Sequence, residues 1–199
     1  YLVFGSPKGI GMDGSLSLNP LSLGDDANGD DNPDMILIQG QSGAPTIGMD
    51  FRDAYFGYSV TGAGDVNSDG YCDFMIGAPG LNLQGVGPLA PDVQKGGGAF
   101  LVFGGPYLAS DGGIINLFDA GASRVAIIPG DLPGGNLGWS LSGAGFVDGD
   151  GISDFLVGAP GTLNQSGLGR VFLLYGNRNA SIAKYTNFAR TGMFGVNNI

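Results

Sequence analysis

Two stretches of the chain, residues 56–80 and 137–161, match each other position by position without a gap. Each begins with an apolar residue followed by Gly, passes through a run rich in Asp, Ser and Gly, and ends in Gly-Ala-Pro-Gly. After a loop, each is followed by an apolar segment that ends in Gly, at residues 99–104 and 170–176. Such repetition indicates a fold made by stacking one supersecondary unit, and this restricts the architecture more than any single residue does.

The pattern within and after the first copy predicts four short strands, at residues 59–63, 74–77, 100–103 and 125–128. Gly, Pro and Asp separate these apolar segments and supply the turns between them. Four short strands per repeat fit one blade of a β-propeller. A β-sandwich with Gly-rich turns is the alternative, but it does not require near-identical repeats. With 40 Gly and no Glu, the chain also lacks good helix formers, so we expect an all-β fold.

We expect residues 1–199 to be part of a single β-propeller domain, with blade cores at about 56–104 and 137–176. Residues 1–55 and 177–199 would then hold partial blades or connecting segments. Propellers close with about four to eight blades. Two well-marked repeats therefore predict that the chain forms part of a larger propeller, or that the propeller closes by assembly with other copies of the chain.

Composition excludes several classes of function. The chain has no His and a single Cys, so it has no Ser-His-Asp or Cys-His machinery and no intrachain disulfide. All 18 acidic residues are Asp and the net charge is -10, which makes nucleic acid an improbable partner. No apolar run reaches the roughly 18 residues of a membrane span, so we expect no direct membrane insertion. With no nucleophile–base set in view, we expect no enzymatic activity.

The acidic run of the first repeat predicts a cation site. Asp65, Asn67, Asp69 and Asp73 occupy positions 1, 3, 5 and 9 of a turn, and the carbonyl of Tyr71 can supply position 7. Oxygen ligands in a flexible loop suit Ca2+ better than zinc or copper. The run starts like an EF-hand loop, but strands flank it and position 12 is not Glu. A solvated acidic turn that uses Asp and Asn for left-handed geometry is the alternative.

The second repeat carries a less complete version of this loop. Phe146 occupies position 1 and cannot be a ligand, whereas Asp148, Asp150, the Ile152 carbonyl and Asp154 remain. We expect calcium here as well, bound more weakly, with water in place of the lost ligand.

A third acidic cluster lies nearer the N-terminus. It places Asp26, Asn28, Asp30, Asn32 and Asp34 at positions 1, 3, 5, 7 and 9, and the apolar segment after it resembles the strand that follows the first loop. The spacing to the first loop is about half the repeat offset, however, and no Gly-Ala-Pro follows at the spacing seen in the two repeats. Either a compressed repeat binds calcium there, or a long connecting loop is merely acidic.

Aromatic residues and the single thiol have simpler interpretations. We expect Phe56, Tyr58 and Trp139 to pack between blades, with a carbohydrate-stacking surface as the alternative. Cys72 is expected to be a small packed side chain, because no acid or base lies near it in sequence to activate it.

Three elements occur in the same order in both repeats: Phe-Gly or Leu-Gly, the acidic loop, and Gly-Ala-Pro. This order resembles the FG-GAP repeat of integrin α-subunit β-propellers and their bacterial and algal relatives. The resemblance implies a propeller of about seven blades, with Ca2+ between the first two strands of some of them. It also implies an extracellular or cell-surface location, and adhesion to a protein or glycan ligand.

Three functions therefore compete. The first is a calcium-binding extracellular FG-GAP propeller module for adhesion, ligand binding or surface assembly. The second is a structural subunit of an extracellular filament or sheath, in which the partners are other copies of the chain. The third is a non-catalytic propeller of a secreted enzyme. Sequons for N-glycosylation begin at Asn164 and Asn179 and would be used if a eukaryote secretes the protein.

Overall fold

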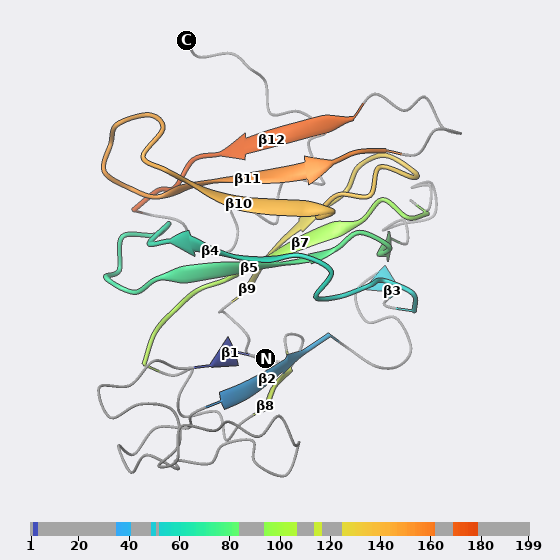
Figure 1. The fold of residues 1–199 in the computed structure, drawn as a ribbon, viewed down its shortest axis with the longest axis horizontal. Coiled ribbons are helices and arrows are strands. Elements are labelled where there is room, and N and C mark those ends of the chain that lie inside the picture. The colour runs from blue at the N-terminus through green and yellow to red at the C-terminus, as the bar shows by residue number, and fades with distance from the viewer. Residues whose placement is uncertain are drawn as a thin grey trace, which may run out of the picture. The chain divides into compact units, whose positions relative to one another are not determined.

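The computed structural model describes residues 2–3, 35–40, 49–50, 52–83, 94–106, 114–116, 125–161 and 169–178. Every regular element among these residues is a strand (Figure 1). The described part of the chain holds no helix long and apolar enough to cross a membrane. The chain separates into two compact units, which are Tyr1–Gln41 with Gly105–Ala122, and Ser42–Gly104 with Ser123–Ile199.

The larger unit contains a four-stranded antiparallel sheet in the order β4-β5-β7-β9. Its strands are β4 (Val60–Gly64), β5 (Asp73–Ala78), β7 (Gly98–Val102) and β9 (Val125–Pro129). They confirm the four strands predicted from the sequence, each to within two residues at either end. The central strands β5 and β7 are almost entirely buried, and for this reason they read as continuous apolar runs rather than as alternating ones.

A second sheet repeats this design with β10 (Ser140–Gly145), β11 (Asp154–Ala159) and β12 (Arg170–Leu174). The register is the same in both sheets: Phe74 pairs with Val102, and its counterpart Phe155 pairs with Leu174. Both first strands also contain a bulge just before the acidic loop. The sequence repeat is therefore a structural repeat down to the pairing of individual residues.

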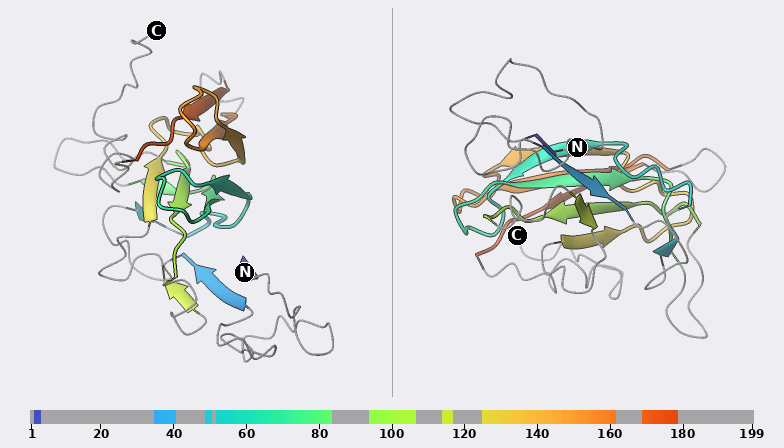
Figure 2. Two further views of the ribbon diagram at one scale, coloured as in Figure 1. Left: turned by 90° about the vertical axis from the view of Figure 1, so that its left-hand side faces the viewer. Right: turned by 90° about the horizontal axis from the view of Figure 1, so that it is seen from below.

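The two sheets pack on each other through a shared apolar core. Met75 and Leu101 of the first sheet belong to the same buried cluster as Phe155, Val157 and Leu174 of the second. In Figure 1 the edge strand β10 runs beside β4, and Figure 2 shows the two sheets from two further directions. Because each large apolar side chain contributes about 1.5–3 kcal/mol when it is fully buried, this cluster is a main source of stability for the larger unit.

The remaining strands are short. In the larger unit, β3 (Met49–Asp50) pairs with β6 (Asn82–Leu83). In the smaller unit, β2 (Met35–Gln39) pairs antiparallel with β1 (Leu2–Val3) and parallel with β8 (Ile114–Asn116).

The pairing of β2 corrects one sequence comparison. The segment after the third acidic cluster was likened to the strand that follows the first loop, which is β5. In the structure β2 follows β1 along the chain and pairs with it, as β9 follows and pairs with β7. Residues 1–5 read Tyr-Leu-Val-Phe-Gly, like the third-strand segment that ends at Gly104. The strand β2, which follows this segment and pairs with it, therefore corresponds to the fourth strand, β9, and not to the second, β5. The sequence comparison was wrong because a short apolar segment after Asp is compatible with either the second or the fourth strand of a repeat.

Candidate metal-binding loops

The two acidic loops connect the first and second strands of the two sheets, β4 to β5 and β10 to β11. Their backbones bend at equivalent positions through left-handed conformations. Ser68 and Gly70 have φ of 59° and 92°, and their counterparts Gly149 and Gly151 have φ of 79° and 80°. Glycine adopts this conformation without steric cost, and this explains the Gly in each loop. The tight turn inferred from the sequence is therefore present in both repeats.

In the first loop, the side chains predicted to bind metal are organised around the loop's own amides. The Asp69 N–H donates to Asp65 Oδ1 and to Asn67 Oδ1, each at 3.1 Å. The Gly70 N–H donates to Asp65 Oδ2 at 2.9 Å, and the Tyr71 N–H donates to Asp69 Oδ1 at 2.9 Å. Since an ionised carboxylate oxygen can accept more than one hydrogen bond, these oxygens keep lone pairs for a cation.

Asp73 closes the first loop from inside the protein. Its side chain is buried; Oδ2 accepts from the Val66 N–H and Oδ1 accepts from the Gly104 N–H, both at 2.8 Å. Burial raises the pKa of Asp73 to about 6, the carboxylates of Asp69 and Asp65 add to the rise, and the two backbone hydrogen bonds oppose it. Asp73 therefore ties the start of the loop to the end of β7.

The second loop repeats this arrangement. Asp154, also buried, accepts from the Val147 N–H at 2.6 Å and from the Gly176 N–H at 3.0 Å. Asp148 accepts from the Asp150 N–H at 3.1 Å, and Asp150 accepts from the Ile152 N–H at 2.8 Å.

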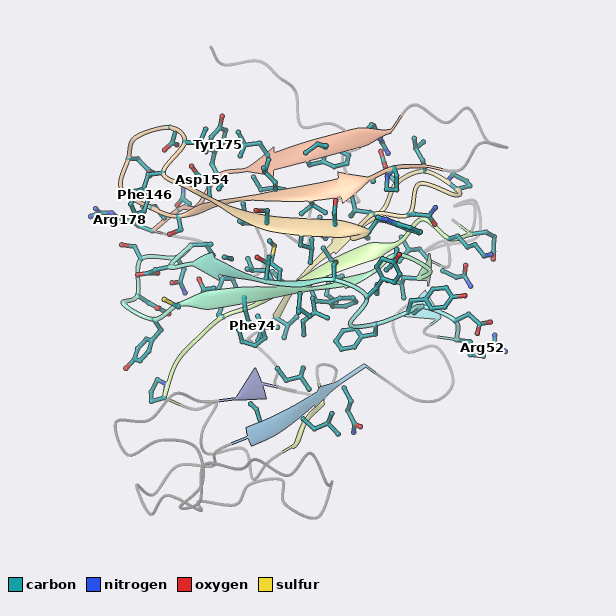
Figure 3. All side chains as sticks on the ribbon, viewed as in Figure 1. Arg52, Phe74, Phe146, Asp154, Tyr175 and Arg178 are labelled. Atoms are coloured by element: carbon teal, nitrogen blue, oxygen red, sulfur yellow. The ribbon has the colours of Figure 1, made fainter. Side chains whose placement is uncertain are left out.

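At position 1 of the second loop, the Phe146 side chain is 60% exposed and offers no oxygen. In Figure 3, Phe146 and Asp154 lie at the same end of the second sheet. The second loop therefore has the same hydrogen-bonded frame as the first, with one candidate ligand fewer.

Backbone hydrogen bonds join the two loops. The Ser153 N–H donates to the Asp65 carbonyl at 3.2 Å, and the Asn177 N–H donates to the Val66 carbonyl at 2.8 Å. The base of the first loop is thus held by the loop and the end of the third strand of the next sheet. Sequence reasoning missed this link and the paired contacts of Asp73 and Asp154. The contacts of Asp73 and Asp154 had a signal in the sequence: an Asp recurs at the start of β5 and β11, and a Gly recurs after β7 and β12.

The donor atoms fit calcium in kind, because both loops offer oxygen atoms alone. Among the described residues, however, no group of three or more His, Cys, Asp or Glu is placed to hold a metal ion. The ligand roles of Tyr71 and Ile152 depend on their carbonyl oxygens and stay predictions. Two further predictions fall outside the described residues. They are the third acidic cluster, with Asp26, Asn28, Asp30, Asn32 and Asp34, and the two glycosylation sequons, at Asn164 and Asn179.

The remaining sequence expectations have mixed outcomes. Tyr58 and Trp139 do meet between the two sheets, with ring centroids 4.8 Å apart, but each stays about half exposed. Phe56 packs edge-to-face on Phe100 at 5.4 Å. The expectation for Cys72 is wrong: its side chain is exposed, because it lies in the loop outside the sheet.

One ion pair had no signal in the sequence. Arg170 on β12 forms a bidentate pair with Asp131, which follows β9, at 2.5 and 3.2 Å. The guanidinium lowers the pKa of Asp131 from its usual value.

Comparison with known proteins finds one repeat match and several distant relatives. Residues 56–102 match the FG-GAP repeat. Phosphatidylinositol-glycan-specific phospholipase D of Dictyostelium discoideum is 28% identical over 130 residues, or 63% of this chain and 13% of that protein. The same enzyme of Bos taurus is 28% identical over 154 residues, or 76% of this chain and 17% of that protein. Integrin alpha-PS2 of Drosophila melanogaster is 32% identical over 134 residues, or 65% of this chain and 8% of that protein.

The chain thus spans less than a fifth of the length of each of these relatives. It contains an FG-GAP repeat, and it is a distant homologue of the FG-GAP regions of integrin α subunits and phosphatidylinositol-glycan-specific phospholipases D.

Proposed function

We propose that this chain is a calcium-binding FG-GAP module of a β-propeller, and that it acts outside the cell or at its surface in adhesion or ligand binding. The observation that carries the proposal is the pair of acidic loops with one backbone geometry, one in each sheet. The integrin relatives support the adhesive role, and the family resemblance supports calcium and the surface location.

In the first loop, Asp65, Asn67, Asp69 and Asp73 would hold the ion, together with the Tyr71 carbonyl. Three carboxylates within nine residues repel one another, and a bound divalent cation removes that repulsion. Hydrogen bonds within the loop already hold the side chains of Asp65, Asn67 and Asp69, so little ordering remains for the ion to impose. Asp148, Asp150, Asp154 and the Ile152 carbonyl would hold a second ion more weakly.

Bound calcium would stabilise more than the loop itself. The Asp65 and Val66 carbonyls accept hydrogen bonds from Ser153 and Asn177, which flank strands of the second sheet, and Asp73 is hydrogen-bonded to Gly104, just after β7. An ion that rigidifies the first loop therefore also supports the junction between the two sheets. We accordingly propose that the sheets are consecutive blades of the propeller.

Thermal unfolding in CaCl2 and in EDTA tests the calcium proposal, with MgCl2 as the ion control. At a hundredfold excess over Kd, one site adds about 2.7 kcal/mol to the free energy of unfolding. The Asp65→Asn variant should lose most of this gain. Asp53→Asn removes the same charge at an exposed position outside both loops and should keep it. A melting temperature that is equal in CaCl2 and EDTA contradicts the proposal.

A second candidate is a non-catalytic propeller module of a secreted enzyme. The two phospholipase D relatives favour it. Both candidates predict that the purified chain has no hydrolase activity, and they differ in cell binding. The adhesive module retains calcium-dependent binding to intact cells when it is immobilised on beads, whereas the enzyme module does not bind them.

A further inference from the structure

Three exposed aromatic residues lie close together where the first strands of the two sheets begin. Tyr58 lies just before β4 and Trp139 just before β10, at equivalent places in the two repeats. Their ring centroids are 4.8 Å apart and their ring planes are tilted by 48°. Tyr55 belongs to the same turn as Tyr58, because the Tyr58 N–H donates to the Tyr55 carbonyl at 3.0 Å. We call Tyr55, Tyr58 and Trp139 the aromatic platform.

The aromatic platform stays in contact with water although the two sheets are packed together. Tyr55, Tyr58 and Trp139 are 64%, 51% and 46% exposed. By contrast, Phe56 of the same turn packs edge-to-face on the buried Phe100 of β7. The turn therefore packs its purely apolar ring against the sheet, and it leaves outside the rings that also carry a polar atom.

The polar atoms of the aromatic platform are available to a ligand. Among the described residues, neither the hydroxyls of Tyr55 and Tyr58 nor the Trp139 Nε1–H has a hydrogen-bond partner. Each of these side chains thus offers an apolar ring and an unused polar tip side by side. A sugar matches both, since its C–H face can stack on an aromatic ring while its hydroxyls form hydrogen bonds.

Tyr55 also has an unusual backbone conformation. Its φ is 54°, in the left-handed region, as is that of its counterpart Asn136, at 52°. Asparagine adopts this conformation readily, whereas a bulky residue there is an outlier. The Tyr55 ring rests against Gly80, where a Cβ would come within 2.7 Å of it. Because strained residues cluster at binding sites, the exposed tyrosine at this position favours a role outside the fold.

The two paired rings are held by the junction between the sheets. The Ser59 hydroxyl donates to the Gly138 carbonyl at 2.7 Å. Since Ser59 follows Tyr58 and Gly138 precedes Trp139, this hydrogen bond restrains the two rings relative to each other. A ligand would therefore meet a preformed pair, and preformed sites bind at a lower ordering cost.

The charge of the chain narrows the class of sugar. The net charge of -10 disfavours glycans that carry sulfate or carboxylate groups. The three side chains of the aromatic platform are themselves uncharged, so a neutral ligand fits them best.

We propose that the aromatic platform binds a neutral oligosaccharide, with a sugar ring stacked on Tyr58 and Trp139 and sugar hydroxyls bonded to the polar tips. The inference rests on the proposed role in ligand binding, for which it names the ligand class. It does not depend on calcium, because the aromatic platform precedes β4 and β10 whereas the acidic loops follow them.

Trp139 is the only tryptophan of the chain, so its fluorescence reports on the aromatic platform. The probes are cellohexaose, mannohexaose and chitohexaose, titrated into the full chain in CaCl2 and in EDTA. At least one sugar should change the fluorescence saturably, with the same Kd in both buffers. Tyr58→Ala should raise this Kd by about two- to tenfold. Phe146→Ala removes an exposed ring at the opposite end of β10 and should leave the Kd unchanged.

Tyr55→Asn separates binding from folding, because it copies the residue of the second repeat. It should raise the Kd by about two- to tenfold, whereas its melting temperature should equal or exceed that of the wild type. A melting temperature that falls while the Kd stays constant would make Tyr55 a structural residue and contradict its place in the aromatic platform.

Other outcomes overturn the inference as a whole. One is the absence of a saturable change with all three sugars; the proposed function survives this result if the immobilised chain still binds cells. Another is a response to hexalysine and to no sugar, which assigns the aromatic platform to a basic peptide. Equal sugar affinity in the wild type and Tyr58→Ala places the site elsewhere. Conversely, sugar binding by a chain that binds no cells refutes the adhesive role alone.

Discussion

Alanine substitution of two equivalent glycines separates backbone strain from contact between the sheets. Gly57 and Gly138 hold the same place in the two repeats, with φ of 88° and 84°. A Cβ on Gly57 would meet no atom within 4 Å, whereas a Cβ on Gly138 would overlap the Gly98 carbonyl oxygen and lie 3.2 Å from the Ala78 nitrogen. The two variants therefore share the cost of positive φ, and only Gly138→Ala adds a collision between sheets.

The expected magnitudes follow from these contacts. A side chain in the left-handed region costs about 1–2 kcal/mol, and the lower entropy of the unfolded alanine chain returns about 0.4–1 kcal/mol. Gly57→Ala should thus lower the free energy of unfolding by about 1 kcal/mol. Overpacking costs about 1–3 kcal/mol more, and the colliding atoms at Gly138 are backbone atoms that cannot rotate away. Gly138→Ala should therefore lose about 2–4 kcal/mol in total.

Urea denaturation with linear extrapolation measures both losses in one buffer, and an unchanged m-value shows that the unfolding transition has kept its character. Equal losses in the two variants would refute the close approach of the two sheets at Gly138.

Two further predictions concern charged groups. Phe146→Asp supplies the missing position 1 of the second loop, so the stabilisation by CaCl2 should rise above that of the wild type; an unchanged or smaller stabilisation counts against the ligand assignment in that loop. In a double-mutant cycle, Asp131→Asn and Arg170→Gln should show a coupling of about 0.2–1 kcal/mol at neutral pH, because the pair is partly exposed. Since the folded pKa of Asp131 is lowered, this contribution is complete above the usual value of 3.8 and disappears as the pH falls through the folded pKa; a coupling that grows on acidification contradicts this sign.

The strands and the tight bends of the loops could be predicted because both follow from local patterns. Short apolar runs between Gly, Pro and Asp specify where strands begin and end. The pattern of the first three strands occurs twice, so each of these has two independent indications in the sequence. The left-handed bends at Gly70 and Gly151 likewise follow from residue type.

Contacts between segments distant in sequence were not predicted. Asp73 and Asp154 were expected as metal ligands only, but both oxygens of each accept hydrogen bonds from the backbone, one of them from the end of the third strand. The hydrogen bond between Ser153 and Asp65, and the ion pair of Asp131 with Arg170, depend on how the sheets stack. No single-strand pattern encodes that stacking.

Calcium titration by calorimetry, on the wild type and on Asp65→Asn, examines the loop chemistry without relying on unfolding. The wild type should bind with a Kd of about 10⁻⁴–10⁻³ M, the range of extracellular calcium modules, and Asp65→Asn should weaken the tighter of the two sites. A wild-type titration with no heat beyond dilution, confirmed by equilibrium dialysis with no bound calcium at millimolar concentration, would contradict the proposal that these loops bind calcium.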